Sequence, residues 1–196
     1  MKLQEKLPNG VTVNGRFYHM NFDYRNVLRM IESMTRKDLT PEAFVYHALK
    51  CVMRHPRGNL RAIYEETKKI LFENANTSKN EKVTDFVQDA DLIRAAFWQT
   101  YNINLWRDKL HWLEFIGLLS GLPEGTRYSD ILNIRVRPMP EPNKYNADER
   151  ARLAKAKAKY AVWMTDEERT DSLEIGLKEM AKGLLMLAGE GGGIDG

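Results

Sequence analysis

Three side chains of types that bind zinc occur at helical spacing in the N-terminal third of the chain. His47, Cys51 and His55 are four residues apart, so a helix would present all three on one side. Structural zinc takes four ligands, however, and the pattern supplies only these candidates. His55 also directly precedes Pro56, where a helix is expected to end. We therefore predict no metal or other cofactor and interpret these residues as part of ordinary packing.

A second group of ionisable residues could support acid–base chemistry. It comprises Asp85, Asp89, Asp91, His111 and Glu114. Asp89 and Asp91 point to different sides of a helix, whereas Asp85 and Asp89 would complement the dipole of a helix that begins there. The sequence pairs no nucleophile with a base and contains no glycine-rich phosphate loop and no His-Glu-x-x-His pattern. It predicts a protein that is not an enzyme and has no catalytic residues.

A run of basic residues is the candidate contact for nucleic acid. It consists of Arg150, Arg152, Lys155, Lys157 and Lys159. Their spacing spreads them around a helix instead of along one face, and lysine, arginine and alanine are strong helix formers in any case. No aromatic residue is interleaved to stack on bases. The pattern favours a solvated helix face, with an acidic protein as the alternative partner, and disfavours nucleic acid.

The composition is that of an ordinary globular protein. Of 196 residues, 43% are apolar and 29% are charged, and the formal net charge is only +3. No run approaches the roughly 18 apolar residues of a membrane span, and the first residues lack the apolar stretch of a secretory signal. Cys51 has no second cysteine to pair with, which fits a reducing compartment. We therefore expect a protein of the cytoplasm without a membrane partner.

Turn residues predict an N-terminal β-hairpin. Asn14 and Gly15 lie between two β-prone runs, and both residues tolerate positive φ angles. Because an isolated hairpin is barely stable in water, it must pack against the rest of the chain. Asp23 is then placed to cap a helix that runs to about residue 35.

Capping residues mark two further helices before a polar stretch. Thr40 supplies an N-cap oxygen and Pro41 fits the first helical position, so a helix begins here and is expected to end at Pro56. The next helix spans about residues 59–72. Residues 74–84 are polar and without periodicity, which predicts an exposed linker between two halves.

The strongest helical pattern follows this linker, after a capping signal at Asp85. Apolar residues recur every three or four positions at Phe86, Ala90, Ile93, Phe97 and Tyr101. The next helix, from about Leu110, is apolar nearly all round and must be buried by its own fold or by a partner. One or two helical turns are expected at residues 128–136. Two more capped helices follow. The first runs from about Asn146 to Trp163, and the last carries apolar residues at heptad-like spacing from Leu173 to Leu187.

These elements predict a mainly α protein, a multi-helix bundle with an N-terminal β-hairpin packed on it. The predicted parts are residues 1–73, the linker, a C-terminal helical region at 85–188 and a disordered glycine-rich tail at 189–196. Residues 135–159 contain eight basic and three acidic residues, whereas residues 160–196 contain three and eight. Such opposite charges suggest pairing within the fold or between copies, which leaves a homo-oligomer open.

Two blocks of sequence are distinctive: Gln-Asp-Ala-Asp at residues 88–91 and Leu-His-Trp at residues 110–112. With looser matches at residues 18–25 and 144–146, they resemble the bacteriophage gene-product-fifteen family, found in long-tailed phages and prophages of Gram-positive bacteria. One departure is Asn-Ile-Asn at residues 102–104, where the family is associated with Gly-Ile-Asp. This difference is expected to weaken the turn after the helix.

The resemblance implies a tail-assembly chaperone. Such a protein coats the long helical tape measure protein before tail tube subunits polymerise around it, and it is absent from the finished virion. The implied partners are the tape measure protein, with the tail tube protein and a companion chaperone as further candidates, in the host cytoplasm. A structural tail or tail-completion protein is the alternative, and a DNA-binding regulator is a third interpretation. The family offers no catalytic residues to carry over.

Aromatic residues in the middle of the chain are the predicted partner-binding residues, because aromatic side chains often anchor interfaces. They are Phe97, Trp98, Tyr101, Trp106, His111, Trp112 and Phe115. Large aromatic residues also dominate protein cores, so about half of the set Trp98, Trp106, Trp112 and Phe115 is expected to be core.

Overall fold

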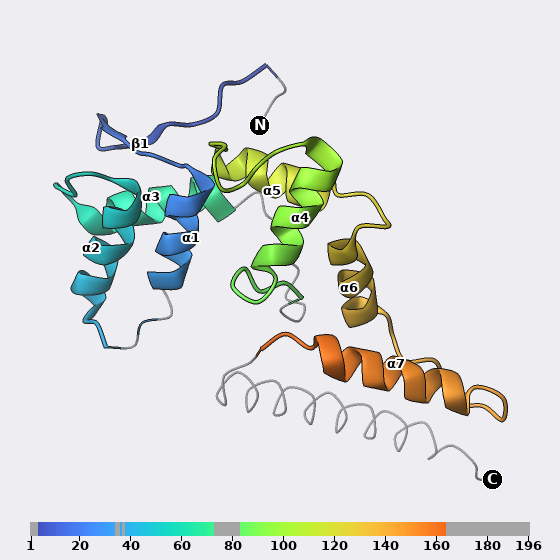
Figure 1. Ribbon diagram of the computed structural model, residues 1–196. Coiled ribbons are helices and arrows are strands. Elements are labelled where there is room, and N and C mark those ends of the chain that lie inside the picture. Colours follow the sequence, from blue (N-terminus) through green and yellow to red (C-terminus); the bar gives the residue numbers. More distant parts are fainter. Residues whose placement is uncertain (1–3, 34–35, 37, 73–82, 164–196) are drawn as a thin grey trace, which may run out of the picture. The chain divides into compact units, whose positions relative to one another are not determined.

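The structure is a computed structural model that describes residues 4–33, 36, 38–72 and 83–163. The chain divides into two compact units, Met1–Tyr160 and Ala161–Gly196, and the first contains all the elements named here. They are β1 (Gly10–Val13), β2 (Arg16–His19), α1 (Tyr24–Ser33), α2 (Pro41–Val52), α3 (Leu60–Phe72), α4 (Ala90–Tyr101), α5 (Trp112–Ser120), α6 (Arg127–Val136) and α7 (Ala147–Tyr160) (Figure 1). This confirms the predicted fold class, mainly α with an N-terminal hairpin. Within the described ranges, no helix combines the length and hydrophobicity needed to cross a membrane.

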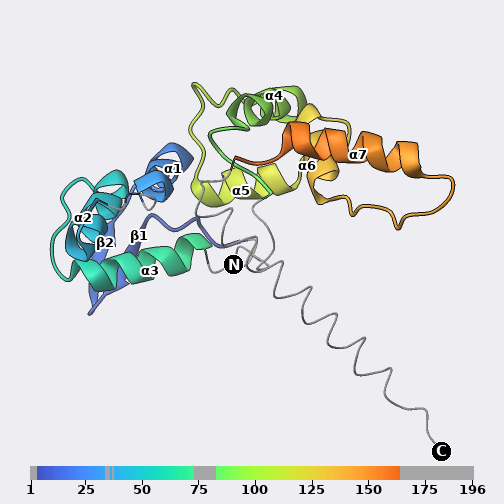
Figure 2. The same ribbon diagram turned by 90° about the horizontal axis from the view of Figure 1, so that it is seen from below.

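The predicted hairpin forms from β1 and β2. Asn14 and Gly15 have φ angles of 50° and 74°, and Val13 pairs with Arg16 across the two-residue turn. Both angles lie in the left-handed region, which explains the Asn-Gly pair. Val13 and its alternate neighbour Val11 are buried, and β1 packs against α3 (Figure 2). The expectation that the hairpin needs a second element to pack on is confirmed.

The residues predicted to cap the first two helices do so. An Asp23 carboxylate oxygen accepts the backbone N–H of Arg25 at 3.0 Å. The Thr40 hydroxyl accepts the backbone N–H of Ala43 at 3.3 Å, directly before the proline that opens α2. Each contact satisfies one of the N–H groups that a helix start leaves without a partner. Local sequence is enough to place both helix starts.

The predicted end of α2 is wrong. The helix ends at Val52, four residues before Pro56, and Met53 is extended with φ −132° and ψ 127°. The Val52 carbonyl instead accepts the backbone N–H of Asn21 at 2.8 Å. This hydrogen bond to the segment after the hairpin thus ends α2 before the chain reaches Pro56, whose ring would otherwise have ended it.

The start of α4 also differs from the prediction. The Asp85 carboxylate accepts two backbone N–H groups of the following residues, each at 2.9 Å, as a capping residue would. Residues 86–89 nevertheless form a turn, and the helix begins at Ala90. Asp89, directly before the helix, is 1% exposed and binds Arg135. A long-range ion pair therefore fixes the point at which α4 begins.

The other end of α4 has a left-handed cap at Asn102. Its φ angle is 55°, its backbone N–H donates to the Trp98 carbonyl at 3.1 Å, and the Ile103 N–H donates to the Phe97 carbonyl at 3.4 Å. Asparagine tolerates this conformation better than other residues with a Cβ atom. The turn after the helix is therefore formed with asparagine at the position where the resemblance leads one to expect glycine.

The last helices are longer or shorter than predicted. Helix α6 has 10 residues rather than one or two turns, because the Thr126 hydroxyl caps it by accepting the backbone N–H of Ser129 at 3.1 Å. Helix α7 ends at Tyr160 and does not reach Trp163. Most of the predicted linker, the predicted last helix and the glycine-rich tail lie outside the described residues, so the division of the chain into parts stays a prediction.

Candidate partner-binding cleft

Stacked aromatic rings from three helices form the centre of the core. The Phe115 ring of α5 lies 4.6 Å from Tyr24 of α1, 5.3 Å from Phe97 of α4 and 5.9 Å from Trp112, between ring centroids. All four side chains are buried. The Trp112 indole N–H donates to the Leu71 carbonyl at 3.1 Å. Because large buried rings interlock with little freedom, this cluster fixes how α1, α4 and α5 face one another.

Two stretches of the resemblance meet in a single β-bridge. The Tyr24 N–H donates to the Leu110 carbonyl at 3.0 Å, and the Trp112 N–H donates to the Phe22 carbonyl at 2.8 Å. His111 lies between them as the N-cap of α5, and it forms a capping box with Glu114. The Asp-aromatic-Arg start of α1 and the Leu-His-Trp block of α5 are thus one structural unit.

His111 has a structural role at this position, because its ring bonds to two backbone groups. Its Nδ1 accepts the backbone N–H of Leu113 at 3.1 Å, so Nδ1 carries no proton there. Nε2 is then the protonated nitrogen and donates to the Pro8 carbonyl at 2.8 Å. Both ring nitrogens are occupied by backbone groups, which explains the histidine without chemistry on a substrate.

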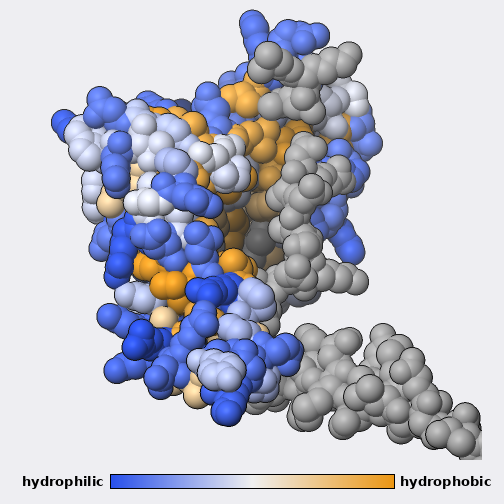
Figure 3. All heavy atoms as spheres, turned by 90° about the vertical axis from the view of Figure 1, so that its right-hand side faces the viewer, coloured by the Kyte–Doolittle hydropathy of each residue, from blue (hydrophilic) through white to orange (hydrophobic). Residues whose placement is uncertain are grey.

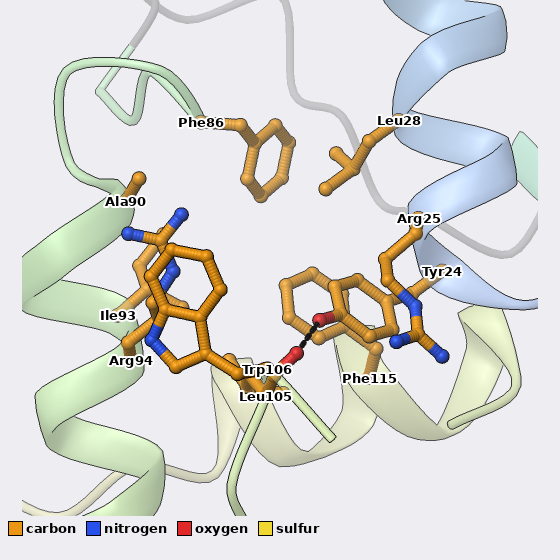
Figure 4. Close-up of a pocket in the computed structure, with 10 residues that line it drawn as sticks. All are labelled: Tyr24, Arg25, Leu28, Phe86, Ala90, Ile93, Arg94, Leu105, Trp106 and Phe115. Atoms are coloured by element: carbon orange, nitrogen blue, oxygen red, sulfur yellow. Dashed lines mark hydrogen bonds between the residues drawn. The ribbon is translucent and has the colours of Figure 1, made fainter. Parts of the chain in front are cut away.

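A cleft of about 250 Å³ opens beside the aromatic core. Residues of α1 form one wall, residues of α4 form the other, and Phe115 of α5 lies at its base (Figure 4). It is lined by Tyr24, Arg25, Leu28, Phe86, Ala90, Ile93, Arg94, Leu105, Trp106 and Phe115. We call this site the aromatic cleft. Its lining is mainly apolar, which suits recognition of an apolar group.

A hydrogen bond between Tyr24 and Leu105 holds one wall of the aromatic cleft in place. The Tyr24 hydroxyl donates to the Leu105 carbonyl at 2.5 Å, which fixes the loop after α4 against α1 (Figure 4). Burial raises the pKa of Tyr24 above its ordinary value, so the hydroxyl keeps its proton. Leu105 is itself 6% exposed. The residue that follows, Trp106, is therefore presented from a fixed backbone.

Arginine side chains from both walls line the aromatic cleft. Arg25 binds Asp23 at 2.7 Å, and Arg94 binds Asp91 at 2.5 Å. Partial burial raises the pKa of Asp23, but hydrogen bonds and charge from Arg25 outweigh it and set the pKa below its ordinary value. The Arg94 guanidinium also lies 4.1 Å from the Trp106 ring centroid, a cation–π contact. The cleft therefore joins an apolar base to a cationic margin.

The predicted partner-binding residues divide into three groups by their exposure. Trp98 is 53% exposed and Trp106 is 71% exposed, whereas Phe97, Trp112 and Phe115 are core residues with exposures of 4% or less. The buried three therefore position the surface and do not form it. Tyr101 and His111 are half-buried. The expected mixture of core and surface aromatic residues is what the structure contains.

Sequence reasoning did not point to the residues of α1 that complete the cleft. Tyr24, Arg25 and Leu28 lie far along the chain from α4, and no local pattern connects the two helices. Arg94 was equally missed, since one arginine on a helix face is usually solvated. The available signal was the similarity of residues 18–25 to the same family as the Leu-His-Trp block.

Further apolar surface lies on α5 and α6. Leu118 and Leu119 of α5 are half-buried, and Val136 at the end of α6 is 57% exposed. On the face drawn in Figure 3, hydrophobic residues gather in a recessed area with hydrophilic residues around it. The exposed apolar area of the protein is thus not limited to the two tryptophans.

The predicted basic face on α7 is divided by its contacts. Lys157 donates to the Arg135 carbonyl at 2.6 Å, and Arg150 donates to the Pro140 carbonyl. The side chains of Arg152, Lys155 and Lys159 are exposed. Three exposed cations remain where five were counted in the sequence.

Asp89, a candidate for acid–base chemistry, is the centre of a buried ion pair. Both carboxylate oxygens accept from the Arg135 guanidinium, at 2.7 and 2.8 Å. The same guanidinium donates to the carbonyls of Val83 at 2.8 Å and Tyr160 at 2.6 Å, and the Asp85 backbone N–H donates to Asp89 at 3.0 Å. The side chains of Arg135 and Asp89 are 7% and 1% exposed. The pair of Asp89 and Arg135 therefore ties the start of α4 to α6, and Arg135 also ties α6 to the end of α7.

Of the candidate zinc ligands on α2, His47 is exposed, whereas Cys51 is half-buried and packs against the core. The Cys51 thiol donates to the His47 carbonyl at 3.4 Å, and His55 lies beyond the end of the helix. Partial burial raises the pKa of Cys51. In the described ranges, no group of three or more His, Cys, Asp and Glu side chains is arranged to hold a metal ion.

Comparison with known proteins gives one match. The family described as "Bacteriophage Gp15 protein" matches residues 3–162, which is most of the chain and includes every element of the cleft. No curated protein and no solved structure is detectably similar.

Proposed function

The chain belongs to the bacteriophage Gp15 protein family, and from this premise we propose that it is a tail-assembly chaperone. In this role it binds the tape measure protein during virion morphogenesis and helps to recruit tail tube subunits. The family match supports a role in building the phage. The choice of partner draws on the surface chemistry of the cleft.

The proposed partner has an apolar surface that must be covered before the tail is assembled. A tape measure protein is a very long amphipathic helix, and its apolar stripe would cause aggregation if it stayed bare. A protein that covers this stripe needs apolar surface of its own that is accessible in the free state. It also needs an anchor that is rigid before binding, because ordering side chains on association lowers affinity.

Trp98 and Trp106 beside the aromatic cleft are the observation that carries the proposal. Tryptophan is among the residues most often found at the energetic centre of interfaces, and these two side chains are 53% and 71% exposed. Trp98 follows Arg94 by one helical turn, so it lies on the same side of α4 as the arginine that contacts Trp106. Trp98 and Trp106 thus both lie near Arg94, Trp98 on the rigid helix α4 and Trp106 on the loop that Tyr24 holds.

The proposal includes further expectations that come from the family resemblance. The protein acts without catalysis and without a cofactor, it works in the host cytoplasm, and it leaves before the virion is complete. A tail tube protein or a companion chaperone would bind at a second surface, for which the exposed apolar residues of α5 and α6 are available.

Co-expression with the tape measure protein of the same phage tests the proposal. The tape measure protein alone should be largely insoluble, and the chain should keep it in solution and co-purify with it. A tape measure protein that stays as insoluble as before, with no complex recovered, would refute the proposal.

Mass spectrometry of purified virions separates a chaperone from a structural tail or tail-completion protein. A chaperone should be missing from the particles, whereas a structural protein should be present in stoichiometric amount. The tail tube protein in the same sample serves as the positive control.

A further inference from the structure

The aromatic cleft has the size of a pocket for one side chain. Its volume of about 250 Å³ is below the range of about 300–1,000 Å³ that is usual for small-molecule sites. An apolar cavity of about 150 Å³ is nevertheless enough to hold a benzene molecule. One aromatic ring or one large aliphatic side chain would therefore fill the space between Leu28, Ile93 and Phe115.

The charged residues of the cleft have a single sign. Among the residues that line it, Arg25 and Arg94 are the charged ones. Their partners Asp23 and Asp91 do not line the cleft, and the Asp91 side chain is 96% exposed. A guanidinium stacked on a ring keeps its N–H groups in its own plane, where they can donate to a further carboxylate. The margin therefore favours an acidic group on the partner and disfavours a basic one.

The backbone around the cleft indicates a helical partner. Its walls are α1 and α4, and neither β1 nor β2 contributes a lining residue. A partner strand would find no main-chain edge to pair with here, whereas a helix satisfies its own backbone and needs only a side-chain contact.

We propose that the aromatic cleft takes one bulky apolar side chain from a partner helix, and that Arg25 and Arg94 pair with an acidic residue three or four positions away on that helix. Residues at this spacing share one helix face, so a single helix can present both groups. The inference rests on the proposed function, in which the partner helix is a segment of the tape measure protein.

Fluorescent peptides of 25 residues that together cover the tape measure protein test this inference with the full chain. Bound peptides should share a large apolar residue with Glu or Asp three or four positions away. Ala90→Phe, which places a ring inside the cleft, should weaken their binding about 30-fold, the loss expected for an interface centre. Tyr145→Ala removes an aromatic side chain that is 90% exposed and does not line the cleft, so it should bind as the wild type does. Circular dichroism melting confirms that the variants fold.

A charge exchange gives the second arm of the test. Arg94→Glu should weaken the same peptides, and replacing the acidic residue of the best peptide with lysine should restore binding to Arg94→Glu while it weakens binding to the wild type. Arg61→Glu, at an exposed position of α3, is the matched control and should change neither affinity.

The outcomes separate the two proposals. If the wild type binds the tape measure protein while Ala90→Phe and the charge exchange have no effect, the cleft inference is wrong and the proposed function stands. If the wild type binds neither peptides nor the intact tape measure protein, both fail. If the wild type forms a dimer that Ala90→Phe dissociates, a second copy of the chain occupies the cleft, and the inference is overturned.

Discussion

Replacing Arg135 with methionine should lower the free energy of unfolding by about 3–5 kcal/mol, the cost of leaving a buried charge without its partner. The substitution removes both hydrogen bonds to Asp89 and those to the carbonyls of Val83 and Tyr160. Asp89 is 1% exposed, so water cannot replace the guanidinium without local opening. For a folded unit of this size, the midpoint of thermal unfolding should fall by about 10 °C.

Urea unfolding followed by circular dichroism measures this loss. Asp89→Leu combined with Arg135→Met removes the charge from both sides and should recover a large part of the stability, because buried pairs can often be replaced by apolar residues. Arg135→Lys keeps the charge but cannot reproduce the two-pronged contact, so it should lie between the wild type and the methionine variant. A loss below about 1 kcal/mol for Arg135→Met would show that the pair is hydrated and not buried.

Three further changes test single contacts. Trp112→Phe removes the N–H that the buried Leu71 carbonyl accepts and should cost about 1–3 kcal/mol in urea unfolding; an unchanged midpoint would contradict this. Gly15→Ala meets no atom within 4 Å, but φ there is 74°, so strain alone should cost about 1–2 kcal/mol. The pKa of Asp23 in the folded state lies below its ordinary value of 3.8, so the ionised carboxylate stabilises the fold at pH values above 3.8. This stabilisation is lost as the pH falls below 3.8. Asp23→Asn should therefore flatten the acid side of the stability profile, and an unchanged slope would refute the assignment.

Features set by neighbouring residues could be predicted from the sequence. The Asn14-Gly15 turn and the cap at Thr40 depend on local backbone angles and on N–H groups a few residues away, and the structure has both. The apolar stripe is confirmed for Phe86, Ile93, Phe97 and Tyr101, which belong to the core or pack against it. Trp98 does not belong to this stripe and is exposed.

Features set by distant residues could not be predicted in this way. Asp89 was interpreted as a partner of the helix dipole, whereas the structure pairs it with Arg135, which no periodicity connects to it. Trp106 and Trp112 look alike in sequence. The β-bridge at His111 places Trp112 in the core, whereas the loop held at Leu105 leaves Trp106 exposed. The aromatic cleft exists only because α1 packs beside α4 and α5 in three dimensions.

In the proposed function, the exposed side chains of Trp98 and Trp106 bind the tape measure protein. The most direct measurement is the amount of tape measure protein that co-purifies with Trp98→Ala/Trp106→Ala, compared with the wild type and with the control Tyr145→Ala, whose aromatic side chain is 90% exposed. We predict that the double variant folds normally and recovers at most about one tenth of the wild-type amount, while the control recovers all of it. Equal recovery by a correctly folded double variant would contradict the claim.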